Sequence, residues 1–550
     1  MMAAETTTST GPPTPPPSAF APLRYRVFAV IWAATVLSNI GTFMRDVASI
    51  WLVTDLSPSP AAAAMIQAAT TLPVFLLAIP AGVLSDILDR RRFLIGIQIG
   101  LAVVSTILAL LAWTGTASIA ALVGLTFLGG IGAALATPPW QAITPELVPR
   151  SEIKGAVALN SLGVNIARSV GPALGGALLA TLGAVAAYAA DILTYAVVIA
   201  ALLWWPRPSE ADQGLREHFG GALRAALRYA RASHELHRVL WRTVVFFAFS
   251  SAAWALLPIV ARQEIRGGPG FYGVMLGSVG AGAIAGAIVL PRIRATIGQD
   301  QLVLAASLIM AAATVALGLT DAEVLGIALA FVLGSAWIGM LTTLNSTMQV
   351  ILPNWVRGRG LAIYYTAFNG AMAGGSLCWG FLAQWIGTDA TLWLGGAGLA
   401  LTAAMAHMAP LPRGEGDLTP SLHWPEPAMA EPVEHDRGPV IVTVTYRIRS
   451  SDRSAFLAAL ARLSEERRRD GAYAWGVSED AADPERLVEW FFVESWVEHL
   501  RQHRRVSKVD ADIQAEIRRF HQKPGDPLVQ HLLALEARHV RAPIPKETLP

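Results

Sequence analysis

The sequence predicts an all-α membrane bundle of about 12 transmembrane helices, followed by a C-terminal α+β domain. Three observations support this fold class: an uneven distribution of charge, a series of long apolar segments, and an internal repeat. Only 15% of the 550 residues are charged and 53% are hydrophobic, whereas soluble proteins average about 25% charged residues. Charges are sparse from Val27 to Leu411 and dense from Pro412 onward, so we expect the first region in lipid and the second in water.

The N-terminal residues 1–22 are rich in Thr and Pro and are expected to form a disordered tail. They lack a basic segment ahead of an apolar core, so we expect no cleavable signal peptide. A net charge of +2 gives no indication of nucleic-acid binding. Cys378 is the one cysteine of the sequence, which excludes an internal disulfide.

Apolar segments of membrane-spanning length fill the region 23–411. A helix needs about 20 apolar residues to cross about 30 Å of hydrocarbon. Gly and Pro are common inside these segments, which is typical of closely packed membrane helices. The predicted spans are 27–54, 62–84, 93–113, 117–141, 153–181, 184–205, 239–262, 271–291, 301–319, 323–350, 360–385 and 389–411.

Basic residues indicate how the bundle is oriented, because cytoplasmic connections carry the excess of Lys and Arg. Alternate connections contain Arg90 to Arg92, Arg150 with Lys154, the segment 206–238, Arg292 with Arg294, and Arg357 with Arg359. The other connections lack Lys and Arg, except for Arg262 and Arg266. We therefore expect a multi-pass protein of the cell membrane with both termini in the cytoplasm. The basic segment 206–238 is predicted to be a cytoplasmic linker with an amphipathic surface helix, and partner binding there stays open.

The halves 23–205 and 239–411 repeat a pattern of residues. Gln141, Pro145 and Val148 correspond in position to Gln349, Pro353 and Val356, and glycines follow each set. Duplicated transporters hold their substrate near the middle of the bilayer between the repeats and open alternately to either side. The repeat therefore predicts a small-molecule transporter.

The loop after the second span reads AGVLSDILDRRRF. It resembles the signature loop of the major facilitator superfamily at Gly82, Asp86, Arg90 and Arg91, and it departs from that pattern at Ile87 and Asp89. The resemblance implies a major facilitator fold in which this loop latches the two halves on the cytoplasmic side. The alternative is that some of the arginines only set the topology.

The fifth span contains Gly171-Pro172-x-x-Gly175-Gly176, which resembles the antiporter signature of exporters in that superfamily. Ala167 stands where another glycine is expected, and simple helix packing is the alternative interpretation. Stretches such as NIGTFMRDVASIWLV resemble the branch that includes enterobactin exporters and related secretion effectors. This resemblance covers most of residues 24–411 and implies efflux of small amphipathic molecules, including siderophores.

Four charged residues inside the spans are candidates for coupling and transport: Arg45, Asp46, Arg168 and Asp191. Asp46 is the first candidate for carrying a proton and Asp191 the second, while Arg168 can neutralise one of them or meet an anionic substrate. A static ion pair that fixes packing is the alternative for each. The sequence contains no Gly-x-x-x-x-Gly-Lys-Ser/Thr loop, so we expect an ion gradient, most simply of protons, to drive transport.

Residues 412–438 are predicted to be a linker, and 439–550 a cytoplasmic domain. The order β-α-β-β-α-β of its predicted elements suggests a ferredoxin-like fold. The stretch FVESWVEHLRQH resembles the antibiotic-biosynthesis monooxygenase type of domain. We predict no catalytic residues, no cofactor and no metal-ligand set. The residues of this stretch whose side chains could serve in catalysis are Trp496, His499 and His503. Self-association or regulation is favoured; a membrane-tethered monooxygenase-like enzyme or a receptor-like scaffold remain alternative functions.

Overall fold

The computed structural model describes residues 20–205, 229–353, 355–408, 410–412, 437–522 and 525–534, with a few positions between 421 and 434. The predicted N-terminal tail, most of the segment 206–238 and the end of the chain after 534 lie outside these residues. The chain divides into two compact units, which we describe separately. The first holds most of the long helices, and the second holds the four-stranded sheet together with the ends of α8, α11, α12 and α13.

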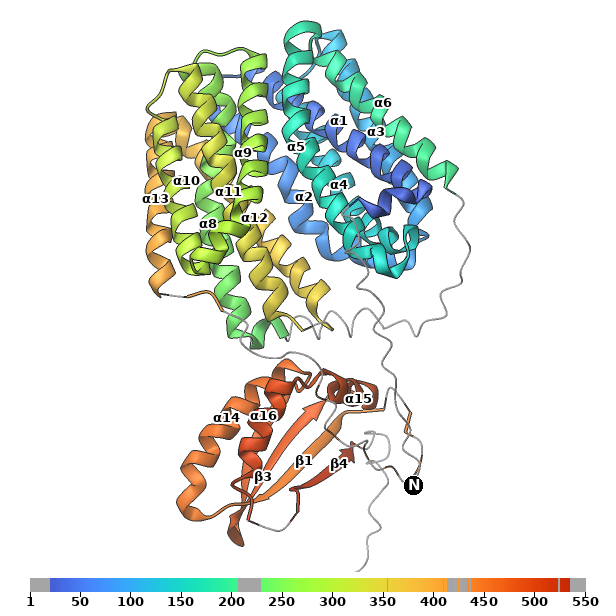
Figure 1. Ribbon diagram of the computed structural model, residues 1–550, viewed down its shortest axis with the longest axis vertical. Coiled ribbons are helices and arrows are strands. Elements are labelled where there is room, and N and C mark those ends of the chain that lie inside the picture. The colour runs from blue at the N-terminus through green and yellow to red at the C-terminus, as the bar shows by residue number, and fades with distance from the viewer. Residues whose placement is uncertain are drawn as a thin grey trace, which may run out of the picture. The chain divides into compact units, whose positions relative to one another are not determined.

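Long helices occupy every predicted span in the described part of the chain (Figure 1). The ends differ by a few residues, the largest difference being α4, which ends at Leu147 rather than at 141. The helices are α1 (Arg26–Leu56), α2 (Pro60–Ile87), α3 (Arg90–Thr114), α4 (Ile119–Leu147), α5 (Ile153–Leu182), α6 (Ala184–Trp204), α8 (His234–Ile259), α9 (Pro269–Thr296), α10 (Gln299–Leu317), α11 (Glu323–Ile351), α12 (Arg357–Ile386) and α13 (Thr388–Met408).

Nine of the described helices are long and apolar enough to cross a membrane. The helices α5, α12 and α13 do not meet that criterion. Polar side chains account for this in α5, which carries Lys154, Asn160, Asn165 and Arg168. The helix α5 lies between two helices that meet the criterion, α4 and α6. We still predict that all twelve long helices cross the membrane.

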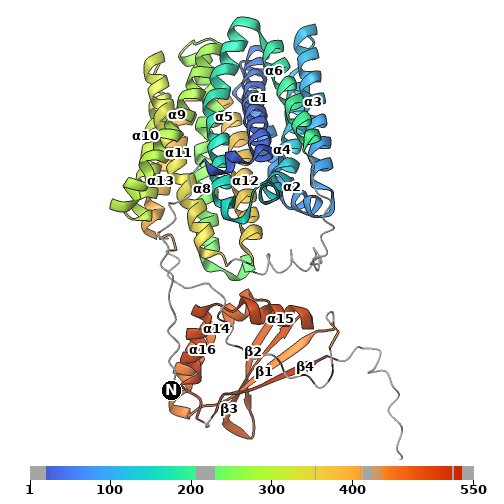
Figure 2. The same cartoon turned by 45° about the vertical axis from the view of Figure 1, so that its right-hand side comes forward.

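The helix α5 connects the two halves of the bundle. It packs against α1 of its own half and against α9 of the other half (Figures 1 and 2). Small residues make this possible, because glycine and alanine let helix backbones approach closely.

The helix α8 continues into a π-helical turn, η3 (Val260–Glu264). This turn carries Arg262 and Gln263.

The C-terminal sheet contains β1 (Val440–Arg447), β2 (Ala474–Asp480), β3 (Asp483–Val493) and β4 (Leu528–Leu533) in the order β2-β3-β1-β4. All three strand pairs are antiparallel. The helices α14 (Arg453–Arg469) and α16 (Lys508–Arg518) pack together beside the sheet, and α15 (Trp496–Arg505) follows β3 (Figure 2). Alternate residues of β1 are buried, as its sequence predicts for a half-buried strand.

The core of this domain forms where sheet and helices bury their apolar sides. Tyr446 of β1 packs on Phe456 of α14, and Leu460, Leu487 and Ile517 join the same cluster. Part of the segment predicted as a linker also contacts the domain: Trp424 Nε1 donates a hydrogen bond to Gln514 Oε1 at 2.7 Å. At least one residue of the predicted linker 412–438, Trp424, is therefore bound to the domain.

Candidate functional site

A cluster of charged side chains lies inside the first half, where α1 and α6 pack together. The Arg45 guanidinium contacts Asp46 at 2.9 Å and lies 3.7 Å from Asp191 Oδ2. It also donates a hydrogen bond to the Tyr195 hydroxyl at 3.0 Å. The structure thus brings together three of the four predicted charged residues, with Asp46 and Asp191 both forming ion pairs with the Arg45 guanidinium.

Burial distinguishes the two carboxylates. The Asp191 side chain is fully buried, whereas that of Asp46 is 31% exposed. Ser105 of α3 donates a hydrogen bond to Asp191 Oδ2 at 2.6 Å, but Asp191 Oδ1 has no hydrogen-bond partner in the described part of the structure. A buried carboxylate is stabilised by ion pairs and by hydrogen bonds to its oxygens. Asp191 therefore lacks part of the stabilisation that its ionised form needs.

The charges of this cluster do not balance when both carboxylates are ionised. Two carboxylates and one guanidinium sum to one negative charge, and no second cation forms an ion pair with either carboxylate among the described residues. A proton on one carboxylate restores neutrality. Of the two carboxylates, Asp46 is the more exposed, and its role as the proton carrier stays a prediction.

Arg168 on α5 is half-buried, and the structure does not bring it to this cluster. No described carboxylate forms an ion pair with it. A cation of this kind inside a bundle requires a counter-ion or contact with water. The structure therefore does not show Arg168 neutralising Asp46 or Asp191, and contact with an anionic substrate stays a prediction.

The glycines of the antiporter-like segment lie at close helix contacts. A Cβ atom on Gly171 or Gly175 would meet Phe43 Cβ at 2.7 Å or Met44 Cα at 2.8 Å, both on α1 beside Arg45. A Cβ on Gly176 would meet Gly273 Cα of α9 at 2.6 Å. Pro172 lies between these glycines, and its carbonyl oxygen would be 2.8 Å from a Cβ on Gly273. The segment therefore links the charged cluster of α1 to the other half of the bundle.

The residues of the gate-like loop make contacts inside the first half. Arg90 forms a 2.9 Å ion pair with Glu146 at the end of α4. Arg91 donates two hydrogen bonds of 2.6 Å to the carbonyl oxygens of Leu202 and Leu203 at the end of α6. Such contacts satisfy carbonyl groups that a helix end leaves unpaired.

The other two residues of that loop lie on α2. Gly82 has open space where a Cβ would be, so helix packing in this conformation does not require a glycine there. The Asp86 side chain lies outside the described residues.

The halves also meet at the end of the bundle where α1 joins α2. Arg262 of the π turn forms an ion pair with Asp55 and lies 5.5 Å from the centre of the Trp51 ring. Gln263 Nε2 donates a hydrogen bond to Pro58 O at 2.8 Å. Gln384 of α12 is hydrogen-bonded to Ser59. These contacts join the first half to the second, and we call them the outer closure because the topology predicted from the sequence places this end of the bundle outside.

Sequence reasoning did not identify the outer closure. Its one signal was Arg262, which together with Arg266 is the exception among connections that otherwise lack Lys and Arg. The structure explains Arg262 by the ion pair with Asp55. A hollow of about 750 Å³ lies beside the closure, lined in part by Gln263, Gln384 and Trp393. Its lining does not include any residue of the Arg45 cluster.

The C-terminal domain buries an ion pair of its own. Glu489 accepts hydrogen bonds from Arg467 at 3.1 Å, Trp475 at 3.0 Å and Tyr446 at 3.1 Å. Both carboxylate oxygens are therefore occupied by partners inside the core. Burial and the neighbouring Glu489 carboxylate raise the pKa of the Tyr446 hydroxyl well above its usual value. This arrangement fixes the core and does not point to catalysis.

The bundle of long apolar helices in two halves, with a buried charged cluster, defines a membrane transporter of the major facilitator type. Solved structures share this fold. A D-xylose–proton symporter matches with a TM-score of 0.57 over 71% of this chain and 99% of that chain, at 16% identity. A nucleoside transporter matches with a TM-score of 0.58 over 70% and 100%, at 9% identity.

The chain belongs to the transmembrane secretion effector family of this superfamily, which it matches over residues 17–540. It is similar to the staphyloferrin A transporter of Staphylococcus aureus, with 24% identity over 341 residues that cover 60% of this chain and 83% of the relative. It is also similar to the macrolide efflux protein A of Streptococcus pyogenes, with 24% identity over 265 residues that cover 48% and 65%. The family and these relatives identify the protein as a transporter. The family match also extends through the C-terminal sheet.

Proposed function

We propose that the protein is a secondary exporter that couples proton entry to the efflux of small amphipathic molecules such as siderophores or drugs. The observation that carries the coupling is the Arg45 cluster, because one arginine faces two carboxylates inside a membrane bundle. The substrate class rests on the relatives, whose names specify staphyloferrin A and macrolide efflux. The resemblance to enterobactin exporters agrees with this class.

In the proposed cycle, Asp46 takes up and releases the proton while Asp191 remains the fixed partner of Arg45. Protonation of Asp46 removes one of the two anionic partners and shifts Arg45 toward Asp191. The Gly171 and Gly175 contacts pass a movement of α1 to α5, and the Gly176–Gly273 contact passes it to the other half. The outer closure then opens when the opposite side closes.

Arg168 supplies the proposed contact with the substrate. It carries a positive charge inside the bundle without a described ion-pair partner, and siderophores that bind iron through oxygen atoms are commonly anionic. An anionic group on the substrate neutralises Arg168 during transport. Replacement of Arg168 by Gln is expected to weaken transport of anionic substrates more than that of neutral ones.

The proposed topology follows the distribution of arginines. All twelve long helices cross the cell membrane, both termini lie in the cytoplasm, and Gly82, Asp86, Arg90 and Arg91 form the cytoplasmic gate motif. The outer closure then faces the outside. The strand order β2-β3-β1-β4 supports a ferredoxin-like fold for residues 439–550, and we propose that this domain regulates the transporter or pairs with a second copy.

Transport into inverted membrane vesicles tests coupling. We expect an imposed pH gradient to drive uptake of at least one compound from a panel of siderophores and macrolides, and a protonophore to abolish it. Asp46→Asn is expected to lower gradient-driven uptake at least tenfold, because the neutral amide cannot carry a proton. Asp321→Asn, which changes an exposed carboxylate between α10 and α11, is the matched control. Gradient-independent uptake, or unchanged uptake by Asp46→Asn, contradicts the coupling proposal.

Deletion of residues 412–550 distinguishes the proposed transporter function from the alternative function of a membrane-tethered enzyme. The bundle alone contains every residue of the proposed transport cycle, so we expect the shortened protein to retain measurable uptake when its amount in the membrane is matched. Complete loss of function in a shortened protein that still inserts normally favours the enzyme alternative.

A further inference from the structure

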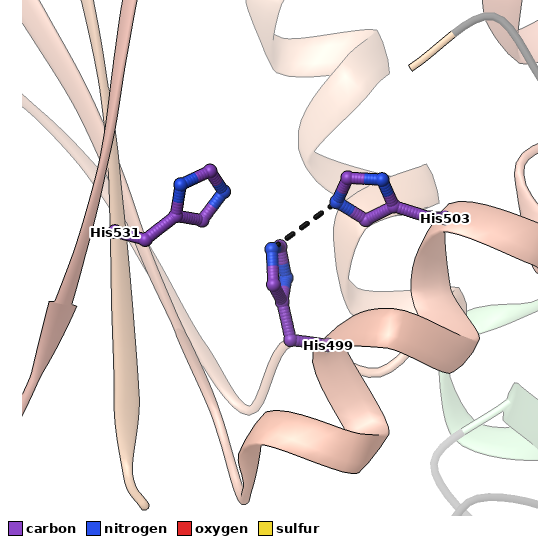
Figure 3. A group of neighbouring side chains, drawn as sticks. All are labelled: His499, His503 and His531. Carbon is purple, nitrogen blue, oxygen red and sulfur yellow. Dashed lines mark hydrogen bonds between the residues drawn. The ribbon is translucent and has the colours of Figure 1, made fainter. Parts of the chain in front are cut away.

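Three histidines from separate elements meet in the C-terminal domain. His499 and His503 lie one helical turn apart on α15, and His531 lies on β4, facing them (Figure 3). One ring nitrogen from each lies within 4.8 Å of the others. The sequence indicated no metal-ligand set, because His531 reaches the other two only through the pairing of β4 with β1.

The distances suit a small transition-metal ion. His499 Nε2 and His503 Nε2 are 3.2 Å apart. Two nitrogens bound to tetrahedral zinc, each about 2.0–2.1 Å from the ion, lie about 3.4 Å from each other. A hydrogen bond between His499 and His503 accounts for two of the rings in the absence of an ion, but it does not account for the approach of His531.

The surroundings prepare His499 to act as a ligand. Its side chain is buried, and its Nδ1 lies 3.4 Å from Gln502 Oε1, which can only accept a hydrogen bond. In the tautomer that carries the hydrogen on Nδ1, this contact is a hydrogen bond and the lone pair of Nε2 points toward His503. Such a hydrogen bond from the far nitrogen is the usual support of a metal-bound histidine.

We propose that His499, His503 and His531 form a binding site for a divalent transition-metal ion, with Zn²⁺ as the best fit. Three imidazoles and no carboxylate favour zinc, copper or nickel over magnesium or calcium, which prefer oxygen ligands. Three protein ligands leave a fourth position for water or a second ligand. His503 and His531 are only partly buried, so an ion can reach the site from solvent.

The site is also connected to the segment that precedes the domain. The Trp424 ring packs edge-on against His503 at 4.8 Å between ring centres. Trp424 is held on α16 by its hydrogen bond to Gln514. An ion that reorients His503 is therefore expected to alter the hydrogen exchange of the backbone around Trp424.

Metal titration of the full-length protein in detergent micelles, with its purification tag removed, tests the site. After treatment with a chelator, we expect isothermal titration calorimetry to show one Zn²⁺ bound per chain. Co²⁺ is expected to give the visible absorption of a four-coordinate ion. His503→Ala and His531→Ala should each weaken Zn²⁺ binding at least tenfold, whereas His234→Ala, which changes an exposed histidine, should not.

Hydrogen exchange of residues 440–533 shows whether each variant retains the folded domain. Tighter binding of Cu²⁺ or Ni²⁺ with the same dependence on the three histidines supports the site and reassigns its ion. Zn²⁺ binding that is absent from the parent, or that is equal in the parent and in folded His503→Ala and His531→Ala proteins, overturns the proposal. None of these readouts depends on transport, so the site and the exporter proposal can fail separately.

Discussion

Individual carboxylates in this protein differ in what surrounds them. Asp46 and Asp191 share Arg45, but the Asp46 side chain is 31% exposed whereas that of Asp191 is fully buried. In the C-terminal domain, Arg469 forms a 2.6 Å ion pair with Asp510 and lies 3.7 Å from Asp470. Glu466 lies beside this group. Burial, and then the Asp510 charge, raise the pKa of Glu466 to about 9, so Glu466 retains a proton at neutral pH.

Glu466→Gln is predicted to change how the stability of this domain depends on pH. The folded-state pKa of Glu466 lies above its unfolded value, so its stabilising effect is complete below the unfolded pKa of about 4.5 and is lost as pH rises toward 9. One such group contributes a slope of at most about 1.4 kcal/mol per pH unit. The amide of Gln stays neutral throughout, so the variant should be more stable than the parent at pH 8 and similar to it at pH 5.

Hydrogen exchange of the segment 453–518 in the full-length protein, compared between variant and parent at each pH, measures this difference. Glu465→Gln is the control, because that side chain is 62% exposed. Equal protection of Glu466→Gln and the parent at pH 8 contradicts a protonated Glu466.

Among the elements, α5 makes close contacts with two neighbouring helices. It lies between α1, which carries Arg45 and Asp46, and α9 of the other half. Glycine at 171, 175 and 176 leaves no room for a Cβ at either contact. Because α5 packs this closely against both α1 and α9, a movement of one of these helices is expected to displace α5 and the other. The antiporter-like pattern in the sequence therefore corresponds to an interface, which agrees with both the packing and the transport interpretations.

Gly176→Val is predicted to lower transport at least tenfold, because the added side chain would overlap Gly273 of α9. Overpacking of this kind costs about 1–3 kcal/mol, which is enough to favour conformations with the helices apart. Gly96→Val on α3 is the control, because a Cβ there meets open space. Vesicle uptake, normalised to the amount of protein in the membrane, measures the effect. Normal uptake by Gly176→Val means that this contact does not matter for the cycle.

At the scale of the whole bundle, the outer closure joins the halves through side chains that lie far apart in the sequence. Arg262 contacts both Asp55 and the ring of Trp51, and Gln263 and Gln384 add hydrogen bonds to the connection between α1 and α2. Exposed ion pairs contribute little, about 0–1 kcal/mol each. Weak contacts of this type can break and re-form in every transport cycle.

A cysteine pair at positions 55 and 262 is predicted to lock the closure. The background is Cys378→Ser, which removes the native thiol, and the substitutions are Asp55→Cys and Arg262→Cys. A direct disulfide needs Cα atoms within about 7 Å, and the ion pair is made by the end of the long Arg262 side chain, so a bifunctional methanethiosulfonate reagent is used to span the two cysteines. The cross-link should stop vesicle uptake, and a reducing agent, which cleaves it, should restore uptake. The single Asp55→Cys protein, treated in the same way, is the control. Continued uptake by fully cross-linked protein shows that this end does not open during transport.

The sequence by itself determined the features that depend on near neighbours in the chain. Hydrocarbon-length apolar runs located the long helices, and alternation located β1, because both patterns reflect the solvent around one element. Length and hydropathy alone support nine spans, since polar residues in α5 mask its apolar character. The charged residues of α1 and α6 were visible as candidates, but their partners were not.

Only the tertiary structure decided which distant residues meet. It paired Arg45 with Asp191, Gly176 with Gly273, Arg262 with Asp55, and His531 with His499 and His503. Local periodicity states which face of a helix or strand is apolar, but it contains no information about the face that packs against it. Side-chain distances across that contact determine the function of each residue, so they had to come from the folded chain.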